Sequence, residues 1–143
     1  MEAKQNIKET VPFLAVSDMQ KSLDFYVNGL GFEIQYQWVP KDRIMWCKLI
    51  NGNGTLMLQE HHQMDAGIMD GQGRAGIGMS IYFICEDALK IYSQMIDKGF
   101  DASEPFVGNN MWVTSVNDPD GYSIFFESVT AVAEGTKFSE WTK

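Results

Sequence analysis

Apolar and polar positions follow the same order in the two halves of the chain. An apolar run from residue 11 ends at Asp18, and apolar residues then recur at helical spacing until Gly31. A second apolar run ends at Glu86, and a second helical pattern continues to Gly99. The second copy lies 68 positions after the first, since 86 − 18 and 99 − 31 both equal 68. The sequence therefore predicts an internal repeat.

Each copy of the repeat predicts one helix and four strands. The acidic residue suits the N-cap of a helix of about three turns, and glycine suits its C-terminal end because it readily adopts a positive φ. Strand-like runs follow each helix, at residues 32–39, 44–50 and 55–60 in the first half and at 100–107, 111–117 and 122–129 in the second. Each half is thus predicted to be a βαβββ unit, and the fold class is α+β.

The chain is long enough for one domain, which we expect to cover residues 1–143. Its parts are a first unit at 7–60, a connecting loop at 61–78, a second unit at 79–129 and a C-terminal tail at 130–143. Residues 51–54, Asn-Gly-Asn-Gly, predict a hairpin turn. Residues 118–121, Asp-Pro-Asp-Gly, predict a turn that precedes the last strand.

Composition excludes some classes of partner. Apolar residues make up 45% of the chain and aromatic residues 13%, which is enough for a packed core. The net charge is −8 and the few basic residues are scattered, so we expect no nucleic-acid surface. No apolar run approaches the roughly 20 residues of a membrane span, and we expect no contact with membranes.

The two cysteines indicate the compartment. Cys47 and Cys85 each lie inside an apolar run, as buried free thiols in a reducing environment do. The first residues lack the apolar core of a signal peptide. We therefore expect a cytoplasmic protein.

The motifs at the two ends of the repeat resemble those of the vicinal oxygen chelate superfamily, which includes glyoxalase I, extradiol dioxygenases and bleomycin-resistance proteins. The opening motif consists of residues 11–18, Leu23 to Tyr26 and Gly29 to Phe32, and the closing motif is residues 118–127. The resemblance implies two βαβββ modules whose mixed sheets curl around a cleft. In metal-dependent members, four side chains that point into this cleft hold a divalent ion.

The four positions implied for metal ligands carry unsuitable side chains in this sequence. They are Val11, Leu58, Ser80 and Phe125. Divalent ions in such sites need imidazole or carboxylate ligands. We therefore expect no metal ion and no other cofactor.

Other polar residues near these positions leave an enzymatic alternative open. Glu60 and Glu127 each lie two residues beyond an implied ligand position, and side-chain alternation would place them on the same face. Glu60 and His61 could act as an acid–base pair. The favoured interpretation is that these are solvated strand ends and loop residues. The alternative is a glyoxalase-like lyase, or a related enzyme, with a non-standard site near Glu60, His61 and Glu127.

An apolar cleft is typical of the bleomycin-resistance branch, whose members bind and sequester antibiotics without chemistry. Large aromatic side chains could stack on a planar ligand. The residues expected to bind such a ligand are Trp38, Trp46, Leu58, Trp112 and Phe125. The predicted function is thus metal-independent binding of a small, partly aromatic molecule. The resemblance also implies a homodimer, with Pro12 at a hinge for strand exchange.

Overall fold

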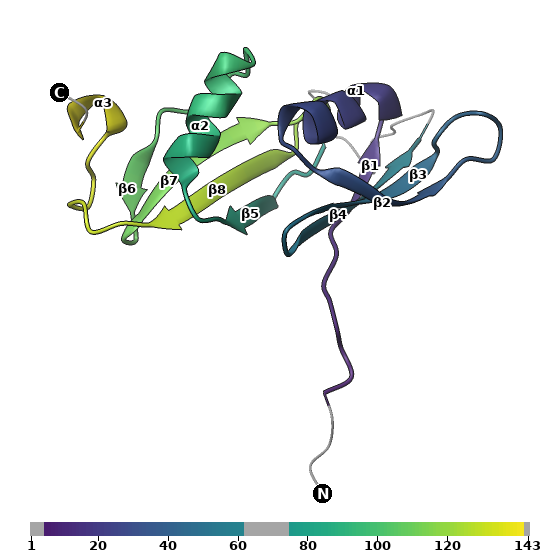
Figure 1. Cartoon of the computed structure of the whole chain (residues 1–143), viewed down its shortest axis with the longest axis horizontal. Helices are drawn as coiled ribbons and strands as arrows, with labels where there is room; N and C mark the ends of the chain where they lie inside the picture. The colour runs from purple at the N-terminus through teal and green to yellow at the C-terminus, as the bar shows by residue number, and fades with distance from the viewer. Residues whose placement is uncertain (1–4, 62–74, 142–143) are drawn as a thin grey trace, which may run out of the picture.

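The structure, a computed structural model, describes residues 5–61 and 75–141. Two modules of the same plan lie side by side, and each carries its helix on one face of its sheet (Figure 1). The first module consists of β1 (Phe13–Val16), α1 (Met19–Leu23), the π-helix η1 (Asp24–Gly29), β2 (Glu33–Trp38), β3 (Trp46–Asn51) and β4 (Gly54–Glu60). The second consists of β5 (Ser80–Ile84), α2 (Ala88–Asp97), β6 (Phe106–Gly108), β7 (Met111–Asn117) and β8 (Ser123–Val129), followed by α3 (Phe138–Trp141).

The two sheets have the same topology, which confirms the predicted pair of βαβββ modules. The strand orders are β1-β4-β3-β2 and β5-β8-β7-β6. In each sheet the first strand is parallel to the last strand of its module, and the other pairs are antiparallel. β1 and β5 are therefore edge strands, with one side paired and the other directed toward the neighbouring module.

Side-chain alternation divides each sheet into a helix-facing side and an open face. In the first module the helix-facing side chains of β1, β3 and β4 are fully buried: Leu14, Val16, Cys47, Leu49, Leu56 and Leu58. In the second module Ile81, Ile124 and Phe126 occupy the equivalent positions. Burial of these side chains provides the main stabilisation of each module.

The N-cap residues of the two helices show that the predicted offset between the two copies is wrong by one residue before the helix. Asp18 caps α1 as predicted, and its side chain accepts a hydrogen bond from Lys21 N–H. In the second module Asp87, one residue after the predicted Glu86, caps α2 in the same way. The first helix contains one more residue before its glycine, and the π-turn of η1 accommodates it. The offset is therefore 69 before the helix and 68 from the glycine onward.

The second predicted strand of the second half is shorter than expected. The sequence predicts a strand at 100–107, whereas β6 begins at Phe106. Pro105 has no N–H to donate to a ladder, and Ser103 forms the contacts in its place, with its N–H bonded to Ser115 O at 2.8 Å. By contrast, β7 has the predicted bounds, residues 111–117.

The C-terminal tail docks on the second module. Phe138 N–H donates to Pro105 O at 2.9 Å. In α3, the rings of Phe138 and Trp141 lie 6.3 and 5.4 Å from the ring of Trp112. Trp112 lies on the helix-facing side and is buried. The tail therefore closes the end of the second core.

Two further expectations concern membranes and the connecting loop. Of the helices in the described ranges, none has the length and apolarity needed to cross a bilayer. Most of the predicted connecting loop, residues 62–74, lies outside the described residues.

Both cysteines are free thiols. Burial raises the pKa of Cys47 to about 11 and also raises the pKa of Cys85.

Candidate functional site

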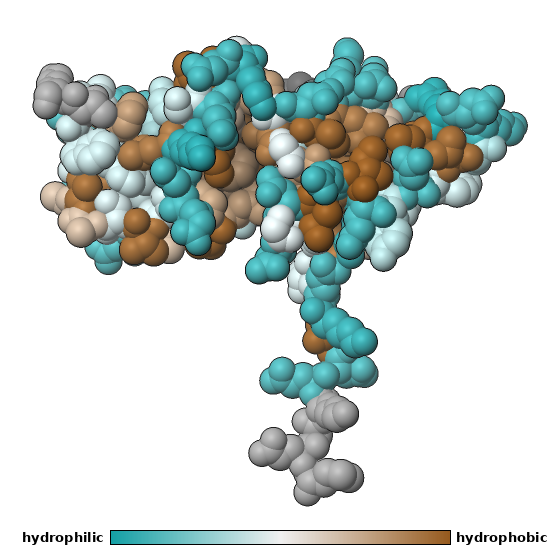
Figure 2. Space-filling model, in the orientation of Figure 1, coloured by the Kyte–Doolittle hydropathy of each residue, from teal (hydrophilic) through white to brown (hydrophobic). Residues whose placement is uncertain are grey.

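The open face of the first sheet carries a group of exposed aromatic side chains. Trp38 on β2 pairs with Trp46 on β3, and the register places Tyr36 beside Lys48 on the same face. Trp38 is 55% exposed and Tyr36 is 60% exposed. In the space-filling view, apolar surface spreads over the half of the molecule that holds β1 to β4 (Figure 2). Exposed aromatic groups of this kind typically mark a binding surface.

The open face of the second sheet carries a stacked aromatic pair. The rings of Tyr82 on β5 and Phe125 on β8 are 4.4 Å apart and nearly parallel, with an interplanar angle of 7°. Tyr82 is 52% exposed, and Glu127 lies two residues beyond Phe125 on the same face. These two rings form a flat apolar platform.

The structure places three of the five residues expected to bind a ligand on open sheet faces and the other two on helix-facing sides. Trp38, Trp46 and Phe125 lie on open faces, as a binding role requires. Leu58 is fully buried because it pairs with Leu14 and Cys47 on the helix-facing side. This is a correction of register by one residue, since Met57 is the residue of β4 that reaches the open face.

Trp112 also lies away from both open faces. It belongs to the helix-facing side of β7, beneath α3. The sequence placed it beside a turn, but it did not show that the tail returns to cover it. Sequence reasoning missed Tyr82, although the strand alternation from Ser80 could have identified it as an open-face residue.

The three acid–base candidates are not brought together. Glu60 is buried on the helix-facing side, where its carboxylate accepts a hydrogen bond from Met19 N–H at 2.8 Å and pairs with Arg43. Glu127 belongs to the other sheet and to its open face. His61 directly follows β4 and is half-buried. Glu60 thus lies on the side opposite to the predicted one, and it caps a helix there.

The residues at the implied metal positions do not fit a metal ion. Val11 and Phe125 have no donor atoms, Leu58 is in the core, and Ser80 is exposed with a neutral hydroxyl. Within residues 5–61 and 75–141, no group of three or more His, Cys, Asp or Glu side chains is arranged to hold a metal ion. The donor chemistry of this chain therefore differs from that of a metal-dependent cleft.

A turn of the second module joins the two modules through buried polar groups. Asp118 accepts hydrogen bonds from Tyr26 O–H at 2.7 Å and from the N–H of Asp120 and Tyr122 at 2.9 Å. Asp120 accepts from the N–H and the hydroxyl of Ser17. Burial and the nearby Asp118 carboxylate raise the pKa of Tyr26 well above its ordinary value, and burial raises the pKa of Asp118.

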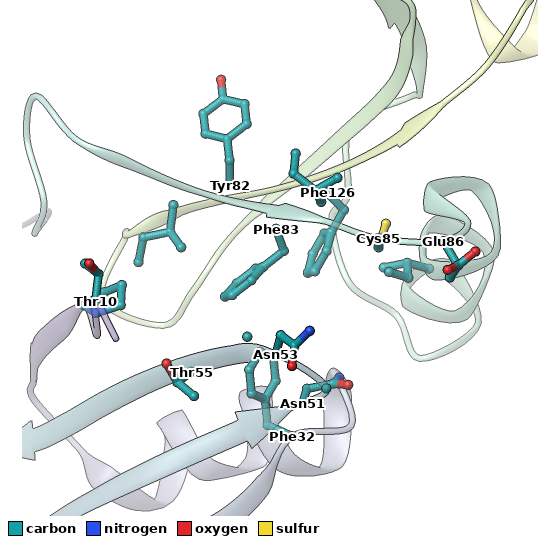
Figure 3. A pocket seen from close by; sticks show the side chains of 16 residues that line it. Thr10, Phe32, Asn51, Asn53, Thr55, Tyr82, Phe83, Cys85, Glu86 and Phe126 are labelled. Atoms are coloured by element: carbon teal, nitrogen blue, oxygen red, sulfur yellow. The ribbon is translucent and has the colours of Figure 1, made fainter. Parts of the chain in front are cut away.

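A cavity of about 830 Å³ lies at the other contact between the modules. In Figure 3, Phe83 and Phe126 from the second module point toward Phe32 of the first, while the ring of Tyr82 points away. Asn51 and Asn53 of the β3–β4 turn face Glu86 across the space. We call this space the inter-module cavity. Its size is in the range of small-molecule sites, roughly 300–1,000 Å³.

The family model for the glyoxalase/bleomycin resistance protein/dioxygenase superfamily matches residues 7–126. The chain belongs to this superfamily. No curated protein gives a significant sequence match. The superfamily assignment agrees with the repeated βαβββ topology and with the closing turn at Asp118.

Solved structures show the same fold at low sequence identity. SMU.1112c is 24% identical with a TM-score of 0.67, and the match covers 85% of this chain and 99% of that protein. The glyoxalase family protein from Enterococcus faecalis is 20% identical with a TM-score of 0.66, and the match covers 84% and 96%. TnmS3, an antibiotic binding protein from Streptomyces sp. CB03234, is 18% identical with a TM-score of 0.65, and the match covers 88% and 100%.

Proposed function

We propose that the protein binds a small, partly aromatic molecule without a metal ion and sequesters it between open sheet faces. The observation that carries this proposal is the placement of aromatic rings on both faces, Trp38 with Trp46 on one and Tyr82 with Phe125 on the other. Such rings bury much area against a planar ligand and attract cations over their faces. The net charge of −8 favours a cationic or neutral ligand over an anion.

The proposal includes a homodimer in which the open faces of two copies enclose the ligand. Within one chain the two sheets lie beside each other (Figure 1), and Trp38 and Tyr82 remain exposed. The N-terminal arm is held to the first sheet by an ion pair between Glu9 and Lys48, whereas residues 5–8 extend away from both sheets (Figure 1), and Ile7 is 85% exposed. Contact with a second copy would cover these apolar groups. Light scattering is expected to give about twice the chain mass of 16.2 kDa.

The relatives support a binding function. TnmS3 has the same fold and is an antibiotic binding protein. Tryptophan fluorescence tests the proposal directly, because Trp38 and Trp46 lie on the expected binding surface. Titration with metal-free bleomycin, as a representative antibiotic, is expected to quench the fluorescence with a dissociation constant on the order of 1 µM, typical of a specific ligand complex.

Two variants sharpen this test. Trp38→Ala is expected to weaken binding by roughly tenfold, since one stacking ring contributes about 1.4 kcal/mol. Trp141→Ala is the matched control, because Trp141 is 49% exposed but lies on α3, and it should bind like the wild type. Absence of quenching, together with unchanged antibiotic sensitivity of cells that express the protein, would contradict the proposal.

A further inference from the structure

The two contacts between the modules are equivalent by the internal repeat, but they are filled to different extents. A tyrosine of the turn closes one, which we call the filled contact, whereas at the other, the hollow contact, the ring of Phe83 lies 5.5 Å from that of Phe32 and a cavity remains beside them. At the filled contact the β7–β8 turn of the second module packs against the start of the first module. At the hollow contact the β3–β4 turn of the first module faces the start of the second across the inter-module cavity. The two contacts therefore have the same backbone arrangement but differ in the side chains that lie between the modules.

A tyrosine ring and its hydroxyl occupy the filled contact. Tyr122 is buried, and its O–H donates to Ala15 O on β1 at 3.0 Å. The next outward group on that edge, Ser17 N–H, donates to the carboxylate of Asp120. An aromatic ring with one hydrogen-bond donor therefore satisfies the free edge of β1.

The free edge of β5 presents the same groups to the cavity. Asp18 and Asp87 cap equivalent helices, so Ala15 corresponds to Ile84 and Ser17 to Glu86. Cys85 N–H donates to Glu127 O on β8. Since alternate residues of a parallel strand bond to opposite sides, Ile84 C=O and Glu86 N–H point away from β8, and both residues line the cavity.

The β3–β4 turn lacks the ring that fills the other contact. Tyr122 directly precedes β8, and the residue that directly precedes the equivalent Thr55 of the first module is Gly54. Two residues, 52 and 53, lie between the paired Asn51 and Gly54, whereas five lie between the paired Asn117 and Ser123. With glycine in place of tyrosine, the ring of Phe83 lies against Gly54, at 3.1 Å from the position of a Cβ, and the cavity remains beside this ring.

We propose that the inter-module cavity is a binding site for a small phenol-like molecule, namely a neutral or cationic aromatic ring with one hydroxyl or amino donor. The ring would pack against the accessible edge of the cluster in which Phe83 lies 5.5 Å from Phe32 and 5.8 Å from Phe126, and the donor would bond to Ile84 C=O. The carboxylate of Glu86 at the rim disfavours anions and accepts from a second donor. Tyr82 borders both this cavity and the open face of the second sheet, but its ring points away from the cavity, and the three phenylalanines of the cavity take no part in the proposed antibiotic binding.

The experiment uses p-cresol, which has the ring and hydroxyl of tyrosine, and toluene, which lacks the hydroxyl. Amide chemical shifts of the full-length protein report the site of binding. We expect p-cresol to shift the Gly54 and Glu86 amides in a saturable way, with a dissociation constant on the order of 1 mM for a probe of this size. Toluene should bind about tenfold more weakly, because it leaves the Ile84 carbonyl unpaired.

Two variants fill the cavity. Gly54→Tyr restores the ring of the other contact, although its Cβ would lie 3.1 Å from the Phe83 ring. Asn53→Tyr fills it from an exposed turn position with less risk to folding. Each should weaken p-cresol binding at least about tenfold. Gln94→Tyr, at an exposed position of α2 away from the cavity, is the control and should bind normally.

Three results would overturn the proposal. They are the absence of saturable shifts at Gly54 and Glu86, equal binding of toluene and p-cresol, and unchanged binding in a folded Asn53→Tyr variant. Shifts confined to the indole N–H groups of Trp38 and Trp46 would instead indicate binding at the open face, so failure of this proposal is distinguishable from failure of the proposed function.

Discussion

The two modules place different polar groups at the same point, the first turn of their helices. In the first module the carboxylate of Glu60 accepts from Met19 N–H at 2.8 Å and pairs with Arg43. In the second, the hydroxyl of Ser128 accepts from Ala88 N–H at 2.8 Å. The first backbone N–H group of each helix therefore bonds to one side-chain acceptor, which is charged in the first module and neutral in the second.

This difference shows that Glu60, an acid–base candidate in the sequence, holds the first turn of a helix in the structure. A buried carboxylate with a hydrogen-bond donor and a cation around it is held in one position. Asp118 and Asp120, which join the modules, are held by hydrogen bonds from hydroxyl and backbone N–H groups. The open faces, where a ligand would lie, carry exposed aromatic rings, among them Trp38 and the stacked pair of Tyr82 and Phe125.

The largest expected effect comes from the contact between the modules. Asp118→Ala removes the acceptor of Tyr26 O–H and of two backbone N–H groups, all of which are buried. Leaving these donors unpaired is expected to lower the free energy of unfolding by about 3–5 kcal/mol. Urea denaturation measures this change. Asn117→Ala, at the exposed residue next to it, should change the value by less than about 0.5 kcal/mol.

A smaller effect tests the two helix caps against each other. Glu60→Ala removes a buried carboxylate and the partner of Arg43, and we expect a loss of about 2 kcal/mol. Ser128→Ala removes a neutral acceptor, and we expect about 1 kcal/mol. Urea denaturation of both variants gives the comparison. Equal losses would mean that the charge of Glu60 contributes nothing beyond the hydrogen bond.

The smallest effect, with a distinct pH dependence, comes from Tyr26→Phe. At neutral pH the lost bond to Asp118 should cost about 1 kcal/mol. Above pH 10 an unfolded tyrosine loses its proton, whereas buried Tyr26 keeps it because its pKa is raised. The unfolded state then binds fewer protons, so stability falls as the pH rises.

The variant should lose part of this alkaline slope. Some slope should remain, since burial also raises the pKa of Tyr122. Thermal melting between pH 7 and about 11 measures the effect. An unchanged slope in Tyr26→Phe would show that Tyr26 is already accessible to hydroxide in the folded protein.

The sequence predicted the modules because their signals are local. Asp18 and Gly31 mark a helix through backbone chemistry that acts within a few residues. The β3–β4 and β7–β8 hairpins follow from turn composition and alternation in the same way. The family resemblance rested on the same motifs, and the family model matches residues 7–126.

The site was harder to predict because it depends on register and on distant contacts. A shift of one residue moves a side chain to the other face of a strand, which is what separates Leu58 from Met57. The π-turn in η1 adds one residue to the first half, so a single offset cannot align both ends of the helices. The docking of Trp141 on Trp112 involves residues 29 positions apart (141 − 112), and no local pattern predicts it.

The turn at Asp118 has a consequence for folding during synthesis. Ser17 and Tyr26 belong to the first module, but their partners are more than 90 residues further along the chain (118 − 26 and 120 − 17). A nascent first module that has left the ribosome must keep the Tyr26 hydroxyl in water until residue 118 arrives. We therefore expect the first half to complete its packing only after the last hairpin has been translated.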